Sequence, residues 1–126
     1  MAAKDEAFTI RTASLFDGER FLRDQCIIIR GETVEQIVPA SQCPPEVPGI
    51  VLEGGILAPG LVDLQVNGGG GVMFNNAPCR ETVEQLSAAH RARGTTSLLP
   101  TLLSDTAEVQ QAALEAVRET RAAGHP

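Results

Sequence analysis

With 126 residues, a formal net charge of −6 and 43% hydrophobic residues, the chain has the composition of one ordinary globular domain or of two small pieces of a larger protein. Its 10 Lys and Arg residues form no basic stripe, and neither Trp nor Tyr is present, which argues against nucleic-acid binding. No apolar run resembles a signal peptide or is long enough to cross a bilayer, so we expect a cytoplasmic protein without a membrane partner.

Short strands are the pattern of the first half, which we assign to a small β-rich domain over residues 1–56. The strand signals are the alternating run Phe8–Thr12, a turn at Asp17-Gly18, a hairpin formed by Cys26–Ile29 and Thr33–Val38, and a short strand near Ile50–Leu52. About 55 residues of such strands make only a marginal core, so this domain requires a covering partner.

Three cysteines, Cys26, Cys43 and Cys79, lie in the chain at wide spacing and without a CxxC pair. An odd number of isolated cysteines does not suggest a disulfide framework, and we expect reduced thiols. No His or Asn partner supports Cys79 as a nucleophile.

The second half, residues 57–126, alternates between strands and helices. Its pattern predicts a strand at Leu61–Val66, a helix at Thr82–Arg93, a strand at Thr95–Leu102 and a helix at Asp105–Ala123. This order calls for a parallel sheet with right-handed crossovers, and hence an α/β fold. Eight-stranded barrels of this kind need about 250 residues, so two βα units indicate a truncated barrel.

The ends of both predicted helices carry sequence signals. Thr82 and Asp105 each begin a capping-box pattern, in which side chains bond the free N–H groups of the first turn. Gly94 and Gly124 stand where helix C-termini favour a residue that tolerates positive φ.

Polar residues follow one another along the strand that begins at Leu61. In strict alternation Asp63, Gln65 and Asn67 share one face, while the opposite, apolar face packs against the helices. The carboxyl end of a barrel strand carries the active site, so these three side chains are the candidate site residues. In isolation they could equally be satisfied polar groups at a strand end.

A glycine run, Gly68–Gly71, leaves this strand. Met73 stands where a GxGxxG motif would need glycine, which argues against a dinucleotide site, and a tight loop near the site is the simpler expectation. His90 lies inside the first predicted helix with no second ligand at i±3 or i±4, so we expect a packed helix residue.

The stretch Ala58–Asp63 resembles the first-strand entry of the amidohydrolase superfamily, where PG(F/L)(I/V)D is followed by His-x-His. Gln65 and Asn67 stand at the two histidine positions here. That replacement, with the glycines and Phe74-Asn75 that follow, is similar to a branch of the N-acetylglucosamine-6-phosphate deacetylases. Gly94–Leu102 resembles the family's second strand, and Phe8–Leu52 resembles its N-terminal β-sandwich, which strands from the far C-terminus complete.

The resemblance implies one divalent metal ion, zinc or a similar metal, with one Glu and two His ligands beyond residue 126. A carboxamide oxygen is a poor zinc ligand, so no catalytic or metal-binding residue is expected in this segment. It further implies that Gln65, Asn67 and Asp63 support the metal-bound water or the substrate, and that Gly68, Gly69 and Asn75 form a loop near the site.

The implied activity of the full-length protein is the hydrolysis of N-acetylglucosamine 6-phosphate to glucosamine 6-phosphate and acetate, in amino-sugar catabolism. The resemblance also implies a homo-oligomer, a dimer or a tetramer, with an amino-sugar phosphate as its small-molecule partner. Two alternatives stay open. One is another amidohydrolase acting on a cyclic amide or a dipeptide, although such enzymes usually retain His-x-His; the other is a non-catalytic fragment. We expect the 126-residue segment alone to be inactive.

Overall fold

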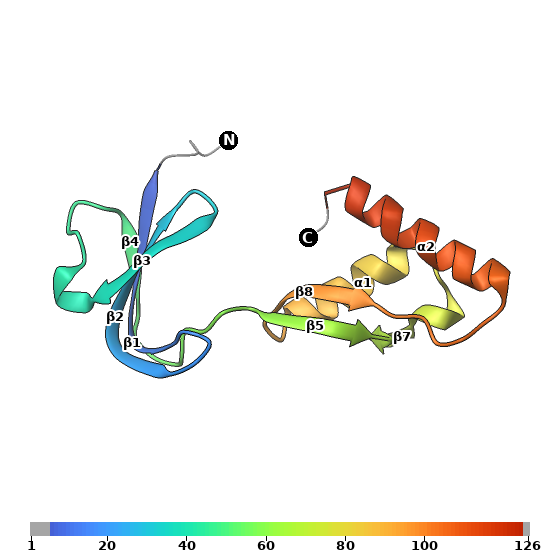
Figure 1. Ribbon diagram of the computed structural model, residues 1–126, viewed down its shortest axis with the longest axis horizontal. Helices are drawn as coiled ribbons and strands as arrows, with labels where there is room; N and C mark the ends of the chain where they lie inside the picture. The colour runs from blue at the N-terminus through green and yellow to red at the C-terminus, as the bar shows by residue number, and fades with distance from the viewer. Residues whose placement is uncertain (1–5, 125–126) are drawn as a thin grey trace. The chain divides into compact units, whose positions relative to one another are not determined.

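The computed structural model describes residues 6–124, which divide into two compact units, one ending at Pro59 and the other beginning at Gly60 (Figure 1). Unit 1 consists of strands and a 3-10 turn, whereas unit 2 combines strands with two α-helices. The predicted α/β class is confirmed. Residues 1–5 and 125–126, which the predicted domain ranges include, lie outside the described residues.

Unit 1 is a four-stranded sheet in the order β3-β2-β1-β4. Its strands are β1 (Ala7–Phe16), β2 (Phe21–Arg30), β3 (Thr33–Pro39) and β4 (Gly49–Leu52), with the 3-10 turn η1 (Ala40–Gln42) after β3. The pairs β1/β2 and β2/β3 are antiparallel, and β4 runs parallel to β1. The strands are those that the sequence predicts, but within the described residues unit 1 has one sheet and not the two layers of a sandwich.

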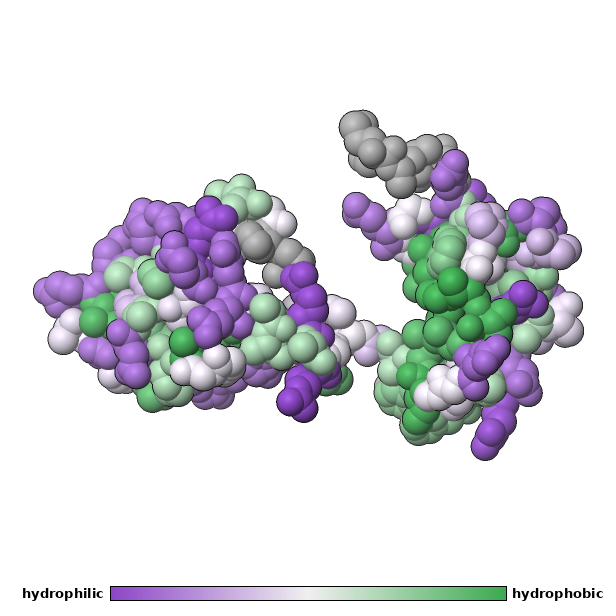
Figure 2. All heavy atoms as spheres, turned by 180° about the vertical axis from the view of Figure 1, so that it is seen from behind, coloured by the Kyte–Doolittle hydropathy of each residue, from purple (hydrophilic) through white to green (hydrophobic). Residues whose placement is uncertain are grey.

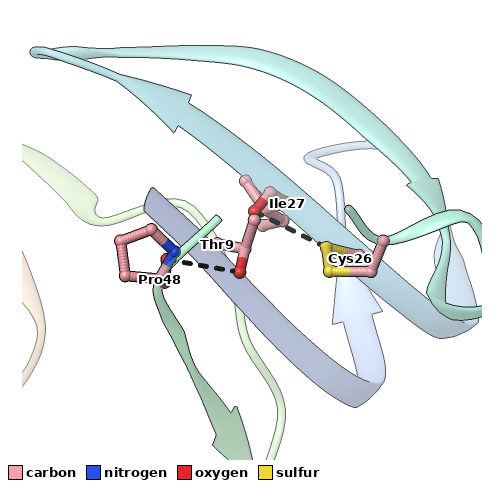
Figure 3. Close-up of a disulfide and its surroundings, with 5 residues drawn as sticks. Thr9, Cys26, Ile27 and Pro48 are labelled. Carbon is pink, nitrogen blue, oxygen red and sulfur yellow. Dashed lines mark hydrogen bonds between the residues drawn. A yellow bond between two sulfur atoms is a disulfide. The ribbon is translucent and has the colours of Figure 1, made fainter. Parts of the chain in front are cut away.

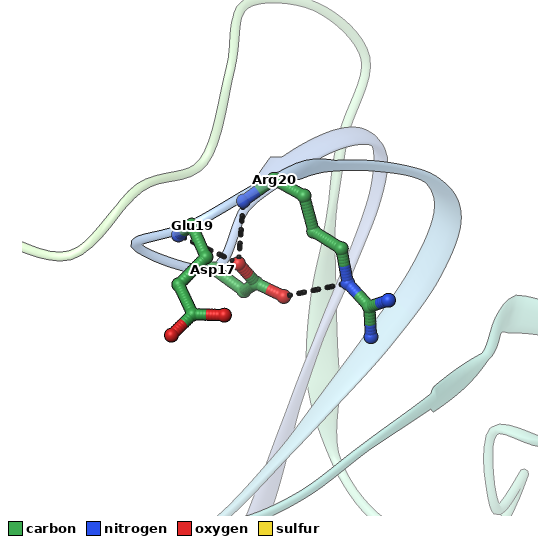
Figure 4. A network of polar contacts seen from close by, with 3 residues as sticks. All are labelled: Asp17, Glu19 and Arg20. Atoms are coloured by element: carbon green, nitrogen blue, oxygen red, sulfur yellow. Dashed lines mark hydrogen bonds and ion pairs between the residues drawn. The ribbon is translucent and has the colours of Figure 1, made fainter.

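The β1–β2 turn is held by the carboxylate of Asp17 (Figure 4). Its Oδ1 accepts hydrogen bonds from the backbone N–H groups of Glu19 and Arg20, both at 2.9 Å, while Gly18 adopts a φ of 107°. The N–H groups of Arg20 and then Glu19 lower the pKa of Asp17 below its usual value. The Asp-Gly turn signal therefore works through a local side-chain cap.

Apolar side chains remain uncovered on unit 1, and Figure 2 shows them gathered on one side of it. The register places Ile10 opposite Ile27 on β2 and beside Ile50 on β4, and Ile27 opposite Ile37 on β3. Within the chain, Ile37 is 41% exposed and Ile50 is 48% exposed. The sheet thus has an apolar surface without a second layer, as expected of a β-rich piece with a marginal core.

Cys26 and Cys43 form a disulfide in unit 1, which corrects the expectation of reduced thiols (Figure 3). Cys26 lies fully buried on β2, and Cys43 follows η1. Their Cα atoms are 5.6 Å apart although 17 positions separate them in sequence, because the chain after β3 turns back alongside β2. Sequence spacing alone does not reveal this proximity. Cys79 is a free, exposed cysteine.

Unit 2 contains two consecutive strand–helix units: β5 (Leu61–Val66), α1 (Arg80–Arg91), β8 (Thr95–Pro100) and α2 (Ala107–Ala122). β5 and β8 are parallel neighbours, as predicted (Figure 1). Between β5 and α1 the chain forms β6 (Gly68–Gly69), β7 (Val72–Met73) and the 3-10 turn η2 (Phe74–Asn76). The core consists of Val66, Phe74, Val83, Leu86, Ala113 and Ala116. Among the described residues no helix is long and apolar enough to span a membrane.

The helix starts differ from the predicted capping boxes. Cys79 is the N-cap residue of α1 and makes no side-chain cap, while Thr82 is buried in the first turns. Thr106, not Asp105, caps α2, and its Oγ1 accepts from Val109 N at 3.4 Å. The carboxylate of Asp105 bonds the side chain of Asn75 instead, so a tertiary contact removes it from the cap.

We expect reduction of the disulfide to destabilise unit 1. Closing a loop of about 15 residues contributes about 3 kcal/mol in the chain-entropy account. Urea unfolding followed by circular dichroism, with and without dithiothreitol, should show a loss of this order, and Cys43→Ser should reproduce it. The Cys79→Ser variant should keep the full sensitivity to reductant. A reductant-insensitive unfolding curve in the parent would contradict the pairing.

Candidate functional site

The carboxyl ends of β5 and β8 lie side by side, and hydrogen bonds join the segments that leave them. Thr101 N donates to Val66 O at 2.8 Å, and the Asn67 side-chain Nδ2 donates to Thr101 O at 2.8 Å. Asn67 therefore links the exit of β5 to the exit of β8. The side-chain amide of Asn67 is therefore bonded to the backbone at Thr101. It also lies at the edge of the parallel sheet that carries the active site in a βα barrel.

Asn75 makes a second link between the same two exits. Its Oδ1 accepts from Leu103 N at 2.9 Å, and its Nδ2 donates to Leu103 O at 3.1 Å and to Asp105 Oδ2 at 2.9 Å. One amide thus satisfies both backbone groups of Leu103 and one carboxylate. The hydrogen bond from Asn75, followed by that from Thr106 N, lowers the pKa of Asp105 below its usual value.

The face pattern predicted for β5 is wrong, and the first shift of its register against β8 already lies between Leu61 and Val62. The pairing with β8 shifts register between Asp63 and Val66, so strict alternation is interrupted there. Val66 is 2% exposed in the core, whereas Val62 and Leu64 are 63% and 69% exposed. The three valine and leucine side chains therefore do not form one helix-covered face.

The carboxylate of Asp63 bonds the strand's own backbone at this irregularity. Its Oδ1 accepts from Gln65 N at 3.1 Å, and its Oδ2 lies 3.9 Å from Nδ1 of His90 on α1. Asp63 is therefore directed to the α1 side of the strand. Gln65 is exposed, and its side-chain amide makes no hydrogen bond within residues 6–124. Of the predicted site residues, Gln65 is the one whose side chain is left available.

The glycine run forms a small hairpin, in which Gly70 and Gly71 turn between β6 and β7 with φ values of 61° and 86°. A Cβ atom at Gly68 would lie 2.7 Å from Val72 O. The close approach that requires glycine at this position comes from the protein's own backbone. Gln85 on α1 also donates to Gly70 O at 2.8 Å, which ties the hairpin to the helix.

His90 was not among the residues that the sequence singled out for the site. Its Nε2 lies 3.1 Å from Gly68 O, and its Nδ1 faces Asp63. The carbonyl can only accept, so this contact is a hydrogen bond in the forms of the imidazole that carry a proton on Nε2. Nothing at i±3 or i±4 marks His90 in the sequence, because its partners lie on another strand and on a loop.

An apolar groove of about 650 Å³ lies beside the exit of β8 in unit 2. Leu64, Leu99, Leu103 and Leu114 are among its lining residues. An aliphatic lining offers few partners to a phosphate or to sugar hydroxyls. We therefore place the candidate site at the polar strand exits and not in this groove.

Acidification should destabilise unit 2 through Asp105. A carboxylate whose folded pKa is lowered stabilises the fold above its ordinary value of 3.8, and that contribution is lost as the pH falls through the folded pKa. Asp105→Asn should therefore show a smaller stability difference between about pH 6 and about pH 3 than the parent, measured by urea unfolding. Glu46→Gln, at an exposed position of unit 1, is the control and should retain the parent's difference.

A side chain at Gly68 should disrupt the hairpin. Gly68→Ala forces its Cβ against Val72 O, and such overpacking costs about 1–3 kcal/mol. Thermal unfolding should show a lower midpoint for this variant. A Cβ at Gly54 meets nothing within 4 Å, so Gly54→Ala is the matched control with an unchanged midpoint. Equal midpoints for the two variants would argue against the packed hairpin.

Two of the curated relatives are deacetylases of amino-sugar phosphates. The chain is 53% identical to N-acetylgalactosamine-6-phosphate deacetylase of Shewanella sp. (strain ANA-3) over 68 residues, which cover 54% of this chain and 17% of the relative. It is 39% identical to N-acetylglucosamine-6-phosphate deacetylase of Haemophilus influenzae over 98 residues, which cover 78% of this chain and 26% of the relative. The chain thus matches about a quarter or less of either relative. No family model matches the sequence.

The fold matches solved structures over nearly the whole chain. N-acetylglucosamine-6-phosphate deacetylase of Pasteurella multocida superposes with a TM-score of 0.84 at 30% identity, covering 92% of this chain and 31% of that one. A variant of the Mycobacterium smegmatis enzyme, in complex with N-acetyl-D-glucosamine-6-phosphate, gives 0.78 at 25% identity over 93% of this chain and 30% of that one. The resemblance inferred from the sequence is therefore confirmed: the chain is similar in sequence and fold to a portion of the N-acetylglucosamine-6-phosphate deacetylases.

Proposed function

We propose that a longer protein containing this chain hydrolyses the acetamide of N-acetylglucosamine 6-phosphate to glucosamine 6-phosphate and acetate. The observation that carries the proposal is the TM-score of 0.84 to the Pasteurella multocida deacetylase over 92% of this chain. The identity of 39% to the Haemophilus influenzae deacetylase supports it.

In this proposal, residues 1–56 supply part of a β-sandwich, and residues 57–126 supply the first two βα units of a (β/α)8 barrel. The parallel pair of β5 and β8, each followed by a helix, supports the barrel assignment. The uncovered apolar face of unit 1 supports a second layer contributed from outside the described residues.

The residues of this chain would act as supports at the mouth of the barrel. Gln65 presents a free amide that can hydrogen-bond the substrate or an attacking water. Asn67 and Asn75 hold the strand exits together, and Gly68 and Gly69 keep the loop beside them tight. None of these groups is a strong acid, base or nucleophile, so the bond-breaking residues belong to the remainder of the protein.

A divalent metal ion, zinc or a similar one, is the cofactor that the resemblance implies. Residues 6–124 do not fit it, because they contain no group of three or more His, Cys, Asp or Glu side chains that could hold a metal ion. Asn67 and Gln65 offer only neutral carboxamide oxygens, which are poor zinc ligands. We therefore assign no ligand to this chain and expect the ligands elsewhere in the longer protein.

The C4 epimer, N-acetylgalactosamine 6-phosphate, is a second candidate substrate. The specific observation in its favour is the 53% identity to the Shewanella deacetylase of that sugar, which exceeds the 39% identity to the Haemophilus enzyme. The two sugars share the acetamide and the phosphate, so the reaction is the same and the difference concerns one hydroxyl.

Other expectations rest on the resemblance alone. They are the homo-oligomeric state of the full-length protein and the inactivity of the 126-residue chain by itself; the cytoplasmic location stays a prediction from the sequence. A different amidohydrolase substrate, such as a cyclic amide or a dipeptide, is the alternative that the following assay separates.

A chimera tests the proposed function. This chain would replace the matched segment of the Haemophilus influenzae deacetylase, and acetate release would be measured with a divalent metal and each of the two sugar phosphates. We expect turnover by the chimera and none by the 126-residue chain. The ratio of kcat/KM for the two epimers decides between them. A folded chimera that hydrolyses a cyclic amide and neither sugar phosphate would overturn the proposal.

A further inference from the structure

One side chain holds both ends of the short segment that carries the candidate site residues. His90, on α1, places Nδ1 3.9 Å from Asp63 Oδ2 and Nε2 3.1 Å from Gly68 O. Asp63 and Gly68 flank residues 64–67, the segment that contains Gln65 and Asn67. An imidazole has two nitrogens at fixed directions, so it can set the separation of the two flanking positions.

The contact to Asp63 reaches Gln65 through the backbone. The other oxygen of the same carboxylate accepts Gln65 N at 3.1 Å, at the point where β5 shifts register against β8. An aspartate side chain that accepts a hydrogen bond from the N–H two residues onward forms an Asx turn. The orientation of this side chain affects the direction in which the next residues leave the strand. Nδ1 of His90 lies 3.9 Å from the oxygen of Asp63 that this turn leaves free, which is an ion-pair distance when the imidazole carries both protons.

The space around His90 is closely fitted. A Cβ atom at Gly69 would lie 2.8 Å from its Nε2, so the loop backbone passes directly over the ring. The side chain of His90 is 26% exposed and that of Asp63 is 38% exposed, which leaves the pair only partly shielded from solvent. A histidine that served only to fill the core would not need polar partners on two separate segments.

We propose that His90 is a positioning residue of the site: acting through Asp63 and Gly68, it fixes the conformation of residues 64–67 and hence the direction of Gln65. This inference rests on the proposed function for its catalytic consequence, but its structural part concerns this chain alone. His90 does not touch the substrate in this account. Its effect is transmitted by the Asp63 carboxylate and the Gly68 carbonyl.

The first test measures conformation in the 126-residue chain. Hydrogen exchange followed by NMR should show the backbone N–H of Gln65 exchanging about tenfold faster in His90→Phe than in the parent. This substitution keeps a ring but removes both polar contacts. Asp63→Asn should give the same direction of change. Arg91→Ala, an exposed neighbour on α1, is the matched control and should leave the exchange rate unchanged. Unchanged exchange at Gln65 in a folded His90→Phe variant would overturn the proposal.

The second test measures catalysis in the chimera. A misplaced site residue lowers turnover by about 10–100-fold, so His90→Phe should lower kcat to that extent. The double variant with Asp63→Asn should be no worse than the poorer single variant, because the two residues act in one chain of contacts. If His90→Phe does not fold, His90→Gln provides the second variant, since its amide can still donate to Gly68 O, and it should retain more activity than Asp63→Asn.

The two tests separate the two proposals. A parent chimera without activity on either sugar phosphate would refute the proposed function, while the exchange rates still decide the positioning role. A lower melting temperature with unchanged kcat and KM would show that His90 only stabilises the fold, and would overturn the inference.

Discussion

Parallel pairing between β5 and β8 brings the exits of two strands to one edge, and the hydrogen bonds between the two outgoing segments depend on it. Thr101 N continues the pairing to Val66 O, and the amides of Asn67 and Asn75 then fasten the two outgoing segments. Backbone N–H and C=O groups at a strand exit lose their ladder partners and must find others. In this protein the side chains of Asn67 and Asn75 provide them, and Asn75 also bonds the carboxylate of Asp105.

The polar side chains at this edge differ in whether they already have a hydrogen-bond partner. Asn67 and Asn75 are committed to backbone partners, whereas the amide of Gln65 is available at the irregularity of β5. The side-chain amides of Asn67 and Asn75 hold the two strand exits together, whereas the exposed side-chain amide of Gln65 can contact a bound molecule. His90 on α1 lies within 3.1 Å of Gly68 O and 3.9 Å of Asp63 Oδ2, at the two ends of the same segment.

Uncovered apolar surface in each unit has a common physical cause. Ile50 on β4 and Leu64 on β5 are 48% and 69% exposed, although both are residues that normally lie in a core. A four-stranded sheet and a two-stranded parallel pair each have too few layers to cover both of their faces. The match to about a third of the Pasteurella multocida enzyme agrees with such incomplete layers.

The sequence by itself determined the order and type of the elements, the parallel arrangement of β5 and β8, and the family resemblance of the run around Asp63. These follow from local periodicity, turn residues and short motifs, which act between neighbours in the chain. Tertiary structure alone decided the Cys26–Cys43 pairing, the use of Asp105 by Asn75 and not as a helix cap, and the contact of His90 with Asp63. Each of these joins residues separated by 17 or more positions, so its free energy depends on how the elements pack and leaves no periodic signal in the sequence.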